Sequence, residues 1–348
     1  MKDITVNPHI TIRQAMKVLN KTAEKCLLVV DENEKLLGTL TDGDLRRSIL
    51  AGVNFSEDVS NSYHTKPTTL IKGKINAEEA KQLFRNLKLD LIPVVNQDNA
   101  VVDYVTWSSM NDGSRPKKLL ADVPVVIMAG GKGTRLEPFT KVLPKPLVPI
   151  NEKPIIEHII ERFTDVGVNQ FILTVNYKAR IMKAFFEELR PDFSVDFVEE
   201  QEPLGTAGSL KFLEDRFDQS FMVTNCDIII KTDYHDLHAF HRKYNYDITL
   251  VASMKNYTIP YGTCELNHEG HLKNIIEKPE YDFLVNTGLY VLKPDVLKLI
   301  PGNQLYHITH LIEDVQKNGK TIGVYPIADD AWIDVGQWAE YQKAVEKI

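Results

Sequence analysis

The apolar residues divide the chain into two parts with different patterns. In the first 110 residues, short apolar runs such as 26–30 and 36–40 stand between stretches with helical spacing. Beyond residue 120, runs such as 123–128 and 171–175 alternate with longer amphipathic stretches. Short continuous apolar runs are typical of strands buried on both faces of a parallel sheet. The second part therefore predicts an α/β, Rossmann-like fold with a doubly wound, mostly parallel sheet.

The first part contains an internal repeat. A shift of 65 positions places Ala15 on Ala80 and Thr41 on Thr106. Each copy predicts a helix, a strand, a polar turn, a second strand and a short helix. We therefore expect two small α/β repeats in tandem.

The repeats place the domain boundaries. The two copies lie at about 1–56 and 62–112, and the polar, turn-rich run 111–116 predicts a linker. We expect one module at 1–120 and a larger domain at 121–348.

A glycine-rich loop follows the apolar run at the start of the second part. Gly130, Gly131 and Gly133 stand there with Lys132 and Arg135. Glycine lets the backbone approach a ligand closely, and exposed N–H groups with two cations form a seat for a nucleotide phosphate chain. The spacing fits neither a P-loop nor the dinucleotide fingerprint. The alternative is a turn without a ligand.

Further polar motifs occur at the ends of predicted strands or in loops, where open α/β sheets bind ligands. They are Lys145 in the stiff segment 143–146, a second glycine loop at 204–208, Asp227, the segments 277–279 and 286–290, and Asp334. Asp227 and Asp334 are isolated carboxylates, the ligands that Mg²⁺ needs when it binds together with phosphates. Each carboxylate alone also fits a helix cap or a turn.

The charge is unevenly distributed. Residues 1–120 hold 17 Lys and Arg against 15 Asp and Glu, whereas the remainder holds 24 against 33. An acidic C-terminal part argues against a nucleic-acid partner, which needs a basic surface. The three cysteines form no metal or disulfide pattern, which favours a cytoplasmic location. The first residues lack a signal peptide's apolar core, and no apolar run approaches the roughly 18 residues of a membrane span, so we expect no membrane partner.

The first part resembles a tandem pair of CBS domains, the regulatory modules named after cystathionine β-synthase. The resemblance rests on the repeat and on the motif 38–44. It implies that Thr41 and Asp44 contact the ribose of an adenine nucleotide, and that the chain forms a homo-oligomer. In the second copy Ser109 replaces the acidic residue, so at most one ribose site is expected. Asp44 fits equally well as a helix cap.

Residues 121–348 closely resemble the sugar-nucleotide pyrophosphorylases, which are nucleoside-diphosphate-sugar nucleotidyltransferases. The resemblance rests on the motifs above taken together. It implies catalytic roles for Arg135, Lys145, Asp227 and Lys278, with Mg²⁺ held by Asp227 and Asp334. The nucleotide would contact Ala129, Gly130, Gly131, Gly133, Thr134, Gln201, Leu204 and Gly205. The sugar phosphate would contact Gly262, Glu277, Lys278, Asn286 and Thr287.

The resemblance implies transfer of a nucleotidyl group from a nucleoside triphosphate to a sugar 1-phosphate, with release of pyrophosphate. The segment 199–208 looks most like guanylyltransferases acting on mannose, heptose or glucosamine 1-phosphate. The order of the two parts is similar to the glucosamine-1-phosphate guanylyltransferases of legionaminic acid synthesis, which supply a cell-surface glycan precursor. A uridylyl- or thymidylyltransferase and a catalytically idle nucleotide sensor are the alternatives.

Other polar residues predict no site. His235, His238 and His241 recur every third residue, so the first and third are about 240° apart on a helix and cannot share a metal. We expect these histidines on a solvated helix face. Cys226 stands beside Asp227, and we expect a small buried side chain there.

Overall fold

The computed structural model describes residues 4–22, 24–74, 77–87, 89–106, 109 and 119–347. The chain forms two compact units. The first holds Met1–Arg115, Met254–Leu284 and Ala328–Asp330, and the second holds Pro116–Ser253, Val285–Ile327 and Ala331–Ile348. The predicted linker at 111–116 and the end of the second repeat lie outside the described residues. The boundary near residue 120 therefore stays a prediction.

Each N-terminal repeat forms a three-stranded sheet with a helix between its first two strands. The first copy holds β1 (Thr5–Val6), α1 (Ile12–Thr22), β2 (Cys26–Val30), β3 (Leu36–Thr41) and α2 (Asp42–Leu50). The second holds β4 (Leu70–Ile71), α3 (Ala77–Leu87), β5 (Leu91–Val95) and β6 (Val101–Thr106). Both sheets join a parallel pair to an antiparallel pair, in the orders β1-β2-β3 and β4-β5-β6.

The strand register confirms the repeat. Cys26 pairs with Thr41 in the first copy, and Leu91 pairs with Thr106 in the second. The second pairing is the first one displaced by 65 positions. The two hairpins also share a register irregularity near their turns.

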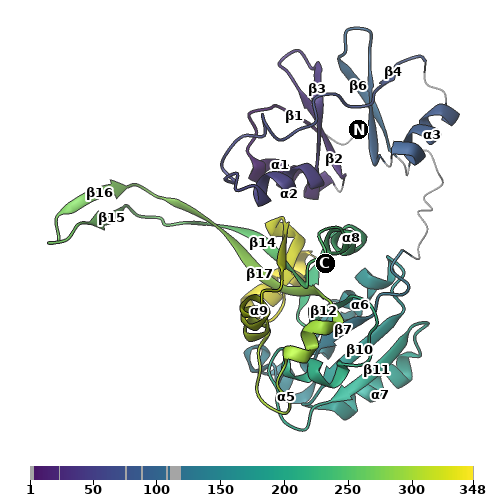
Figure 1. The fold of residues 1–348 in the computed structure, drawn as a ribbon, viewed down its shortest axis with the longest axis vertical. Helices are drawn as coiled ribbons and strands as arrows, with labels where there is room; N and C mark the ends of the chain where they lie inside the picture. Colours follow the sequence, from purple (N-terminus) through teal and green to yellow (C-terminus); the bar gives the residue numbers. More distant parts are fainter. Residues whose placement is uncertain are drawn as a thin grey trace. The chain divides into compact units, whose positions relative to one another are not determined.

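The second unit is built on a seven-stranded sheet with the order β11-β10-β7-β12-β17-β14-β18 (Figure 1). The strands are β7 (Val125–Met128), β10 (Gln170–Val175), β11 (Ser194–Glu199), β12 (Phe221–Asn225), β14 (Ile248–Thr258), β17 (Glu280–Leu292) and β18 (Ile322–Ile327). Strand β7 is parallel to β10 and β12, and β14 is parallel to β18, whereas β17 is antiparallel to β12. This mostly parallel sheet confirms the predicted fold class.

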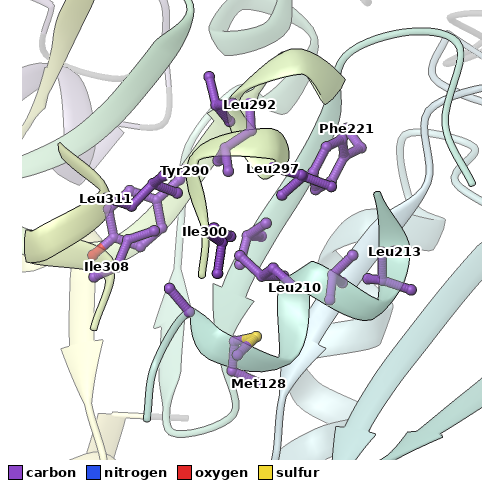
Figure 2. Packing of buried hydrophobic residues seen from close by; sticks show 14 of the residues in the cluster. Met128, Leu210, Leu213, Phe221, Tyr290, Leu292, Leu297, Ile300, Ile308 and Leu311 are labelled. Atoms are coloured by element: carbon purple, nitrogen blue, oxygen red, sulfur yellow. The ribbon is translucent and has the colours of Figure 1, made fainter. Parts of the chain in front are cut away.

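Strand β7 lies inside the sheet and is buried on both faces. Successive side chains of a strand point to opposite faces, and Val126 and Met128 belong to the core cluster of Figure 2. Val125 and Ile127 therefore point to the opposite face, and they are fully buried too. This double burial explains why the β7 sequence is continuously apolar rather than alternating.

Helical segments cover both faces of the sheet. In Figure 2, Met128 packs near residues of η3 (Gly208–Leu213), η4 (Pro294–Leu299) and α9 (Ile308–Lys317). On the other face lie α6 (Ile155–Thr164) and α8 (Tyr234–Lys243), because the Phe163 ring lies 6.4 Å from Phe171 of β10 and 4.4 Å from Tyr234. Helix α7 (Ala179–Leu189) packs beside the edge strand β11 (Figure 1).

Shorter elements complete the chain. They are η1 (Thr134–Leu136), α5 (Phe139–Val142), η2 (Lys145–Leu147), the hairpin β8 (Pro149–Ile150) and β9 (Lys153–Pro154), the pair β13 (Ile228–Ile230) and β19 (Trp332–Asp334), η5 (Asp329–Ala331) and α10 (Trp338–Lys347). Strands β15 (Thr263–Leu266) and β16 (Leu272–Ile276) form an antiparallel hairpin. Across the described residues, we find no helix with the length and apolar character that crossing a membrane requires.

Candidate active site

The first glycine loop leads from β7 to η1 and lies against Lys145. Gly133 has a φ of 69°, a left-handed conformation that favours glycine. A Cβ at this position would lie 2.8 Å from the Cβ of Lys145. Thr140 Oγ1 donates to the Gly133 carbonyl at 2.9 Å. The absence of a side chain at Gly133 therefore sets how closely the loop approaches Lys145.

Gly130 makes room for a buried carboxylate, that of Glu200. A Cβ at Gly130 would lie 2.9 Å from Glu200 Oε1, whereas one at Gly131 would meet nothing within 4 Å. Glu200 Oε2 accepts the Leu204 N–H at 3.1 Å. Burial raises the pKa of Glu200, and the bond from Leu204 partly offsets this rise. Glu200 thus joins the two glycine loops, a role that the sequence did not predict.

The second glycine loop is held against the segment before α9. Gly205 has a φ of 82°, and a Cβ there would lie 2.7 Å from the Tyr306 carbonyl oxygen. The same carbonyl accepts the N–H groups of Ala207 and Gly208 at 3.0 Å. Gln201 is exposed at the start of this loop. The loop is therefore anchored at one end and open at the other.

Asp227 and Asp334 meet on either side of one glycine. Asp227 directly precedes β13 and Asp334 ends β19, and the two strands pair through Ile228 and Asp334. A Cβ at Gly336 would lie 2.9 Å from Asp334 Oδ1 and still closer to Asp227 Oδ2. The Gly336 N–H donates to Asp334 Oδ1 at 2.7 Å. The structure thus brings together two carboxylates that the sequence placed 107 positions apart.

Two cations accompany these carboxylates. The ammonium group of Lys145, a buried residue, forms an ion pair with Asp227 Oδ2. Burial raises the pKa of Asp334 and the charge of Asp227 adds to the rise, while the Gly336 N–H, Lys145 and Arg135 oppose it. Arg135, an exposed residue of η1, therefore acts electrostatically on the same cluster. The cluster contains two negative and two positive side chains.

The cluster fits a divalent ion that arrives with a polyanion. Asp227 and Asp334 offer hard oxygen ligands, and Mg²⁺ binds through one or two carboxylates while keeping waters and phosphate oxygens. Among the described residues there is no group of three or more His, Cys, Asp or Glu side chains arranged for a metal. The donor set is thus the sparse one that suits a metal–phosphate complex.

Cys226 adds no nucleophile to this cluster. It is buried, as expected, and burial raises the pKa of its thiol to about 12. The thiolate is the reactive form of cysteine. Cys226 is therefore neutral and packed at neutral pH.

The residues predicted to face the sugar fall in two places. Asn286 and Thr287 lie in β17, where Asn286 Nδ2 donates to the Tyr290 hydroxyl at 2.8 Å and Thr287 Oγ1 donates to the Val251 carbonyl at 2.8 Å. Thr287 is buried, so in this structure its hydroxyl serves the sheet. The sugar contacts of both residues stay predictions.

The other three sugar-side residues belong to the ribbon of residues 254–284. A Cβ at Gly262 would lie 3.0 Å from Glu277 Oε2, so these two residues are close together. Lys278 follows with a φ of 46°, and both Glu277 and Lys278 are exposed. Their contacts with a sugar phosphate stay predictions.

Thr41 and Asp44 form a helix cap in the first N-terminal repeat. Asp44 Oδ2 accepts the Thr41 N–H at 2.8 Å and the Thr41 hydroxyl at 2.6 Å, and Thr41 Oγ1 accepts the Asp44 N–H at 3.1 Å. Arg47 pairs with the other oxygen of Asp44. The N-cap of α2 is therefore Thr41 and not Asp44, which completes the capping box as the N3 residue; ribose binding by these two residues stays a prediction.

The expectation of a solvated histidine face on α8 is wrong for two of the three residues. His235 is exposed, but His238 and His241 are buried. His238 Nε2 lies 2.9 Å from Ser220 Oγ, and His241 Nδ1 lies 2.9 Å from Thr249 Oγ1. Hydroxyl partners inside the fold let two imidazoles be buried without a metal.

The family model for nucleotidyl transferases matches residues 124–348, which is more than half of the chain. The chain belongs to the nucleotidyl transferase family. The CBS domain model matches residues 1–51, the first N-terminal repeat. Both expected resemblances are therefore confirmed at the level of the family, with a CBS domain ahead of the nucleotidyl transferase domain.

Two curated relatives of this nucleotidyl transferase carry the same name. A mannose-1-phosphate guanyltransferase of Aspergillus fumigatus is 38% identical over 185 residues, which cover 50% of this chain and 50% of that protein. The enzyme of the same name from Candida albicans is 37% identical over 230 residues, covering 61% of this chain and 60% of that protein. The chain thus spans about half to three fifths of the length of these relatives.

Solved structures share the fold. HddC from Yersinia pseudotuberculosis, 29% identical, matches with a TM-score of 0.52 over 65% of this chain and 99% of that chain. A second structure of HddC, in complex with GMP-PN, matches with a TM-score of 0.51. These matches confirm the nucleotidyl transferase fold.

Proposed function

We propose that this nucleotidyl transferase moves a guanylyl group from GTP to a sugar 1-phosphate and releases pyrophosphate and a GDP-sugar. The observation that carries the proposal is the cluster of Lys145, Asp227 and Asp334 around Gly336, with Lys145 packed against the glycine loop. A phosphate-binding loop beside two carboxylates and a buried lysine suits a triphosphate that binds with a divalent ion. Glucosamine or mannose 1-phosphate is the acceptor class.

Guanine and the sugar are favoured by the relatives. The curated relatives named above are mannose-1-phosphate guanyltransferases, and HddC was solved with GMP-PN. In this proposal the open end of the second glycine loop, at Gln201, Leu204 and Gly205, reads the base. Uridylyl or thymidylyl transfer by the same mechanism is the alternative.

The proposed reaction needs positioned charged groups more than it needs a general base. The sugar 1-phosphate is mostly dianionic at neutral pH because the second pKa of a phosphate monoester is about 6. One of its oxygens forms a bond to the α-phosphorus, while the bond from that phosphorus to the bridging oxygen breaks and pyrophosphate leaves. Lys145 and Arg135 neutralise the phosphates, and the loop N–H groups orient them.

Other residues complete the proposed site. Lys278 holds the phosphate of the sugar 1-phosphate, while Glu277 and Asn286 address its hydroxyls. Mg²⁺ held by Asp227 and Asp334 would supply further charge neutralisation when bound. Binding and orientation of the two substrates are assigned to side chains and backbone groups of the chain.

A pyrophosphate-release assay tests the proposal. Four triphosphates are combined with mannose, glucosamine and glucose 1-phosphates in the presence of Mg²⁺. We expect turnover with GTP and one of the first two sugars. Turnover only with UTP or dTTP would keep the chemistry and reassign the base. Tight GTP binding without turnover of any pair would favour the nucleotide sensor.

A further inference from the structure

The loop between β10 and α7 is hydrogen-bonded to α5, the short helix that follows the first glycine loop and η1. Lys178 Nζ donates to the Lys141 carbonyl at 2.7 Å and to the Thr140 carbonyl at 3.3 Å. The Tyr177 hydroxyl donates to the same Thr140 carbonyl at 3.4 Å. These bonds join segments that lie 37 or 38 positions apart in the sequence.

The two carbonyls that Lys178 contacts belong to the C-terminal end of α5. The last four carbonyls of a helix have no partner within that helix. Helix α5 has four residues, and a helix this short is unstable unless other groups hold it. A lysine ammonium group at the C-terminal carbonyls satisfies them and also favours the negative end of the helix dipole. Lys178 therefore caps α5 from another part of the chain.

The position of α5 sets the first glycine loop through Thr140, a buried residue. Its main chain accepts the bond from Lys178, while its Oγ1 donates to the Gly133 carbonyl at 2.9 Å. A Cβ at Gly133 would lie 3.0 Å from Thr140 Cγ2 and 2.8 Å from the Cβ of Lys145. Contacts thus run without a break from Lys178 through Thr140 and Gly133 to Lys145.

Lys178 is itself anchored on a rigid element. It is the residue before α7, whose side chains Met182 and Phe186 are buried. Its carbonyl accepts the Ile181 N–H at 3.0 Å and the Met182 N–H at 3.3 Å. Its φ of 57° is a left-handed conformation that residues other than glycine rarely adopt. The fold therefore holds an unfavourable backbone conformation at the residue whose side chain caps α5.

The same loop also holds the second glycine loop. Asn176 Nδ2 donates to the Glu200 carbonyl at 2.7 Å, and the Glu200 N–H donates to the Val175 carbonyl at 2.8 Å. The Glu200 carboxylate in turn lies close to Gly130. Residues 176–178 thus contact the supports of both loops that are proposed to bind the nucleotide.

We propose that Lys178 is a positioning residue for the triphosphate. It caps α5, and through Thr140 it holds the first glycine loop in the geometry that binds phosphates. The inference rests on the proposed function, because the triphosphate is the ligand assigned to this loop. In this role Lys178 contacts main-chain carbonyls and not the substrate. Small displacements of positioning groups cost binding and rate, so the loss of this contact should be measurable.

Steady-state kinetics of the full-length chain test this role. Lys178→Met keeps most of the apolar stem and removes the donors, so the KM for GTP should rise about tenfold while the KM for the sugar 1-phosphate changes less than about twofold. Lys178→Arg keeps donors for two carbonyls and should restore most of the affinity. Lys183→Met is the matched control, because Lys183 lies on the same helix but pairs with Glu199 at the surface.

A double-mutant cycle tests whether Lys178 acts through Thr140. Thr140→Val keeps the shape of the side chain and removes the hydroxyl that reaches Gly133. In that background the effect of Lys178→Met on the KM for GTP should shrink from about tenfold to about twofold, because coupled residues are not additive. A full tenfold effect in both backgrounds would indicate a direct contact with a phosphate and would overturn the proposal.

Hydrogen exchange of the ligand-free chain separates this proposal from the proposed function. The N–H groups of Leu136, Lys141 and Leu143 are hydrogen-bonded within the loop and α5. Lys178→Met should speed their exchange by about tenfold, whereas Lys183→Met should leave it unchanged. Unchanged exchange in Lys178→Met would overturn the proposal even if GTP is turned over. Faster exchange in a chain that neither binds nor turns over GTP would reject the proposed function while keeping the role of Lys178 in the loop.

Discussion

Lys145 occupies its place because of residues far from it in the sequence. Gly133 leaves room for its side chain, and Asp227 pairs with its ammonium group. The sequence predicted all three residues by their chemistry, since a cation, a glycine loop and an isolated carboxylate fit phosphate transfer. It could not predict the ion pair, because pairing depends on how strand ends meet in the sheet.

Asp227→Asn and Asp334→Asn should each lower kcat by about 100-fold or more, because each removes a charge that would hold the metal and so weakens stabilisation of the transition state. Steady-state kinetics at saturating Mg²⁺ measure this. Asp295→Asn is the control, since Asp295 forms an ion pair with the exposed Lys298 on the surface. A normal kcat in either site variant would remove that residue from the metal site.

Substitution of three neighbouring glycines by alanine should have different effects on stability and activity. Gly133→Ala should lower stability and kcat, because its φ is left-handed and its Cβ would press on Lys145. Gly130→Ala should disturb Glu200 and raise the KM for the triphosphate. Gly131→Ala should leave the melting temperature unchanged, because a Cβ there meets no neighbour. Equal melting shifts in all three variants would contradict this arrangement of the loop.

Helix α8 shows where sequence patterns fail at the scale of an element. Histidine counts as a polar residue in an amphipathic pattern, so the spacing of the three histidines predicted a solvated helix face. The hydroxyl partners of His238 and His241 are Ser220, which directly precedes β12, and Thr249 of β14. The hydrogen-bond partner of a buried polar residue depends on the tertiary structure, so a local sequence pattern does not predict it.

Burial of these histidines predicts an acid-sensitive domain. Burial lowers the pKa values of His238 and His241 from 6.5 to about 4. Between these values the unfolded state binds more protons than the folded state, so the free energy of unfolding should fall as pH decreases from about 6.5 to about 4 and be unaffected by these groups above 6.5. At about 1.4 kcal/mol per pKa unit, the loss by pH 4 is on the order of 3 kcal/mol per histidine.

Urea unfolding at several pH values measures this effect. The slope of stability against pH should be shallower in His238→Gln and His241→Gln than in the unmodified chain. His235→Gln is the matched control, because His235 is exposed on the same helix. Identical slopes in all three variants would show that the acid sensitivity arises elsewhere.

The cap of α2 permits a separate test of the N-terminal repeats. If Asp44 also binds ribose hydroxyls, an adenine nucleotide at 100 times its Kd should stabilise the chain by about 2.7 kcal/mol. Asp44→Ala should abolish that shift, while Ser109→Ala at the equivalent position should keep it. Basal kcat should stay near normal in both variants, because the sites are distinct. A nucleotide-induced shift that persists in Asp44→Ala would place the ligand elsewhere.

At the scale of the whole molecule, the sequence predicted the class of both parts. An internal repeat with a 65-residue shift and continuous apolar strands both predict the fold class directly, because neither pattern depends on which tertiary partners the residues find. The role of Glu200 was missed, because a glutamate after a strand looks like an ordinary polar end. The exposure of Leu266, Leu272 and Ile275 in the ribbon was missed too, since alternating apolar residues in a hairpin normally indicate a buried face. Whether such a face is exposed depends on what packs against it in the folded protein, which the pattern of one hairpin does not contain.

The ion pair between Lys145 and Asp227 has a consequence for how substrates arrive. In the structure each of these groups is the other's ion-pair partner, although one is proposed to bind a phosphate and the other a cation. A phosphate that takes the lysine frees the aspartate, and a divalent ion that takes the aspartate frees the lysine. Each ligand should therefore raise the affinity of the other by the same factor, as thermodynamic reciprocity requires. A phosphate or a divalent ion that binds alone must break the ion pair between Lys145 and Asp227. When both bind, each of the two side chains exchanges its partner for a ligand.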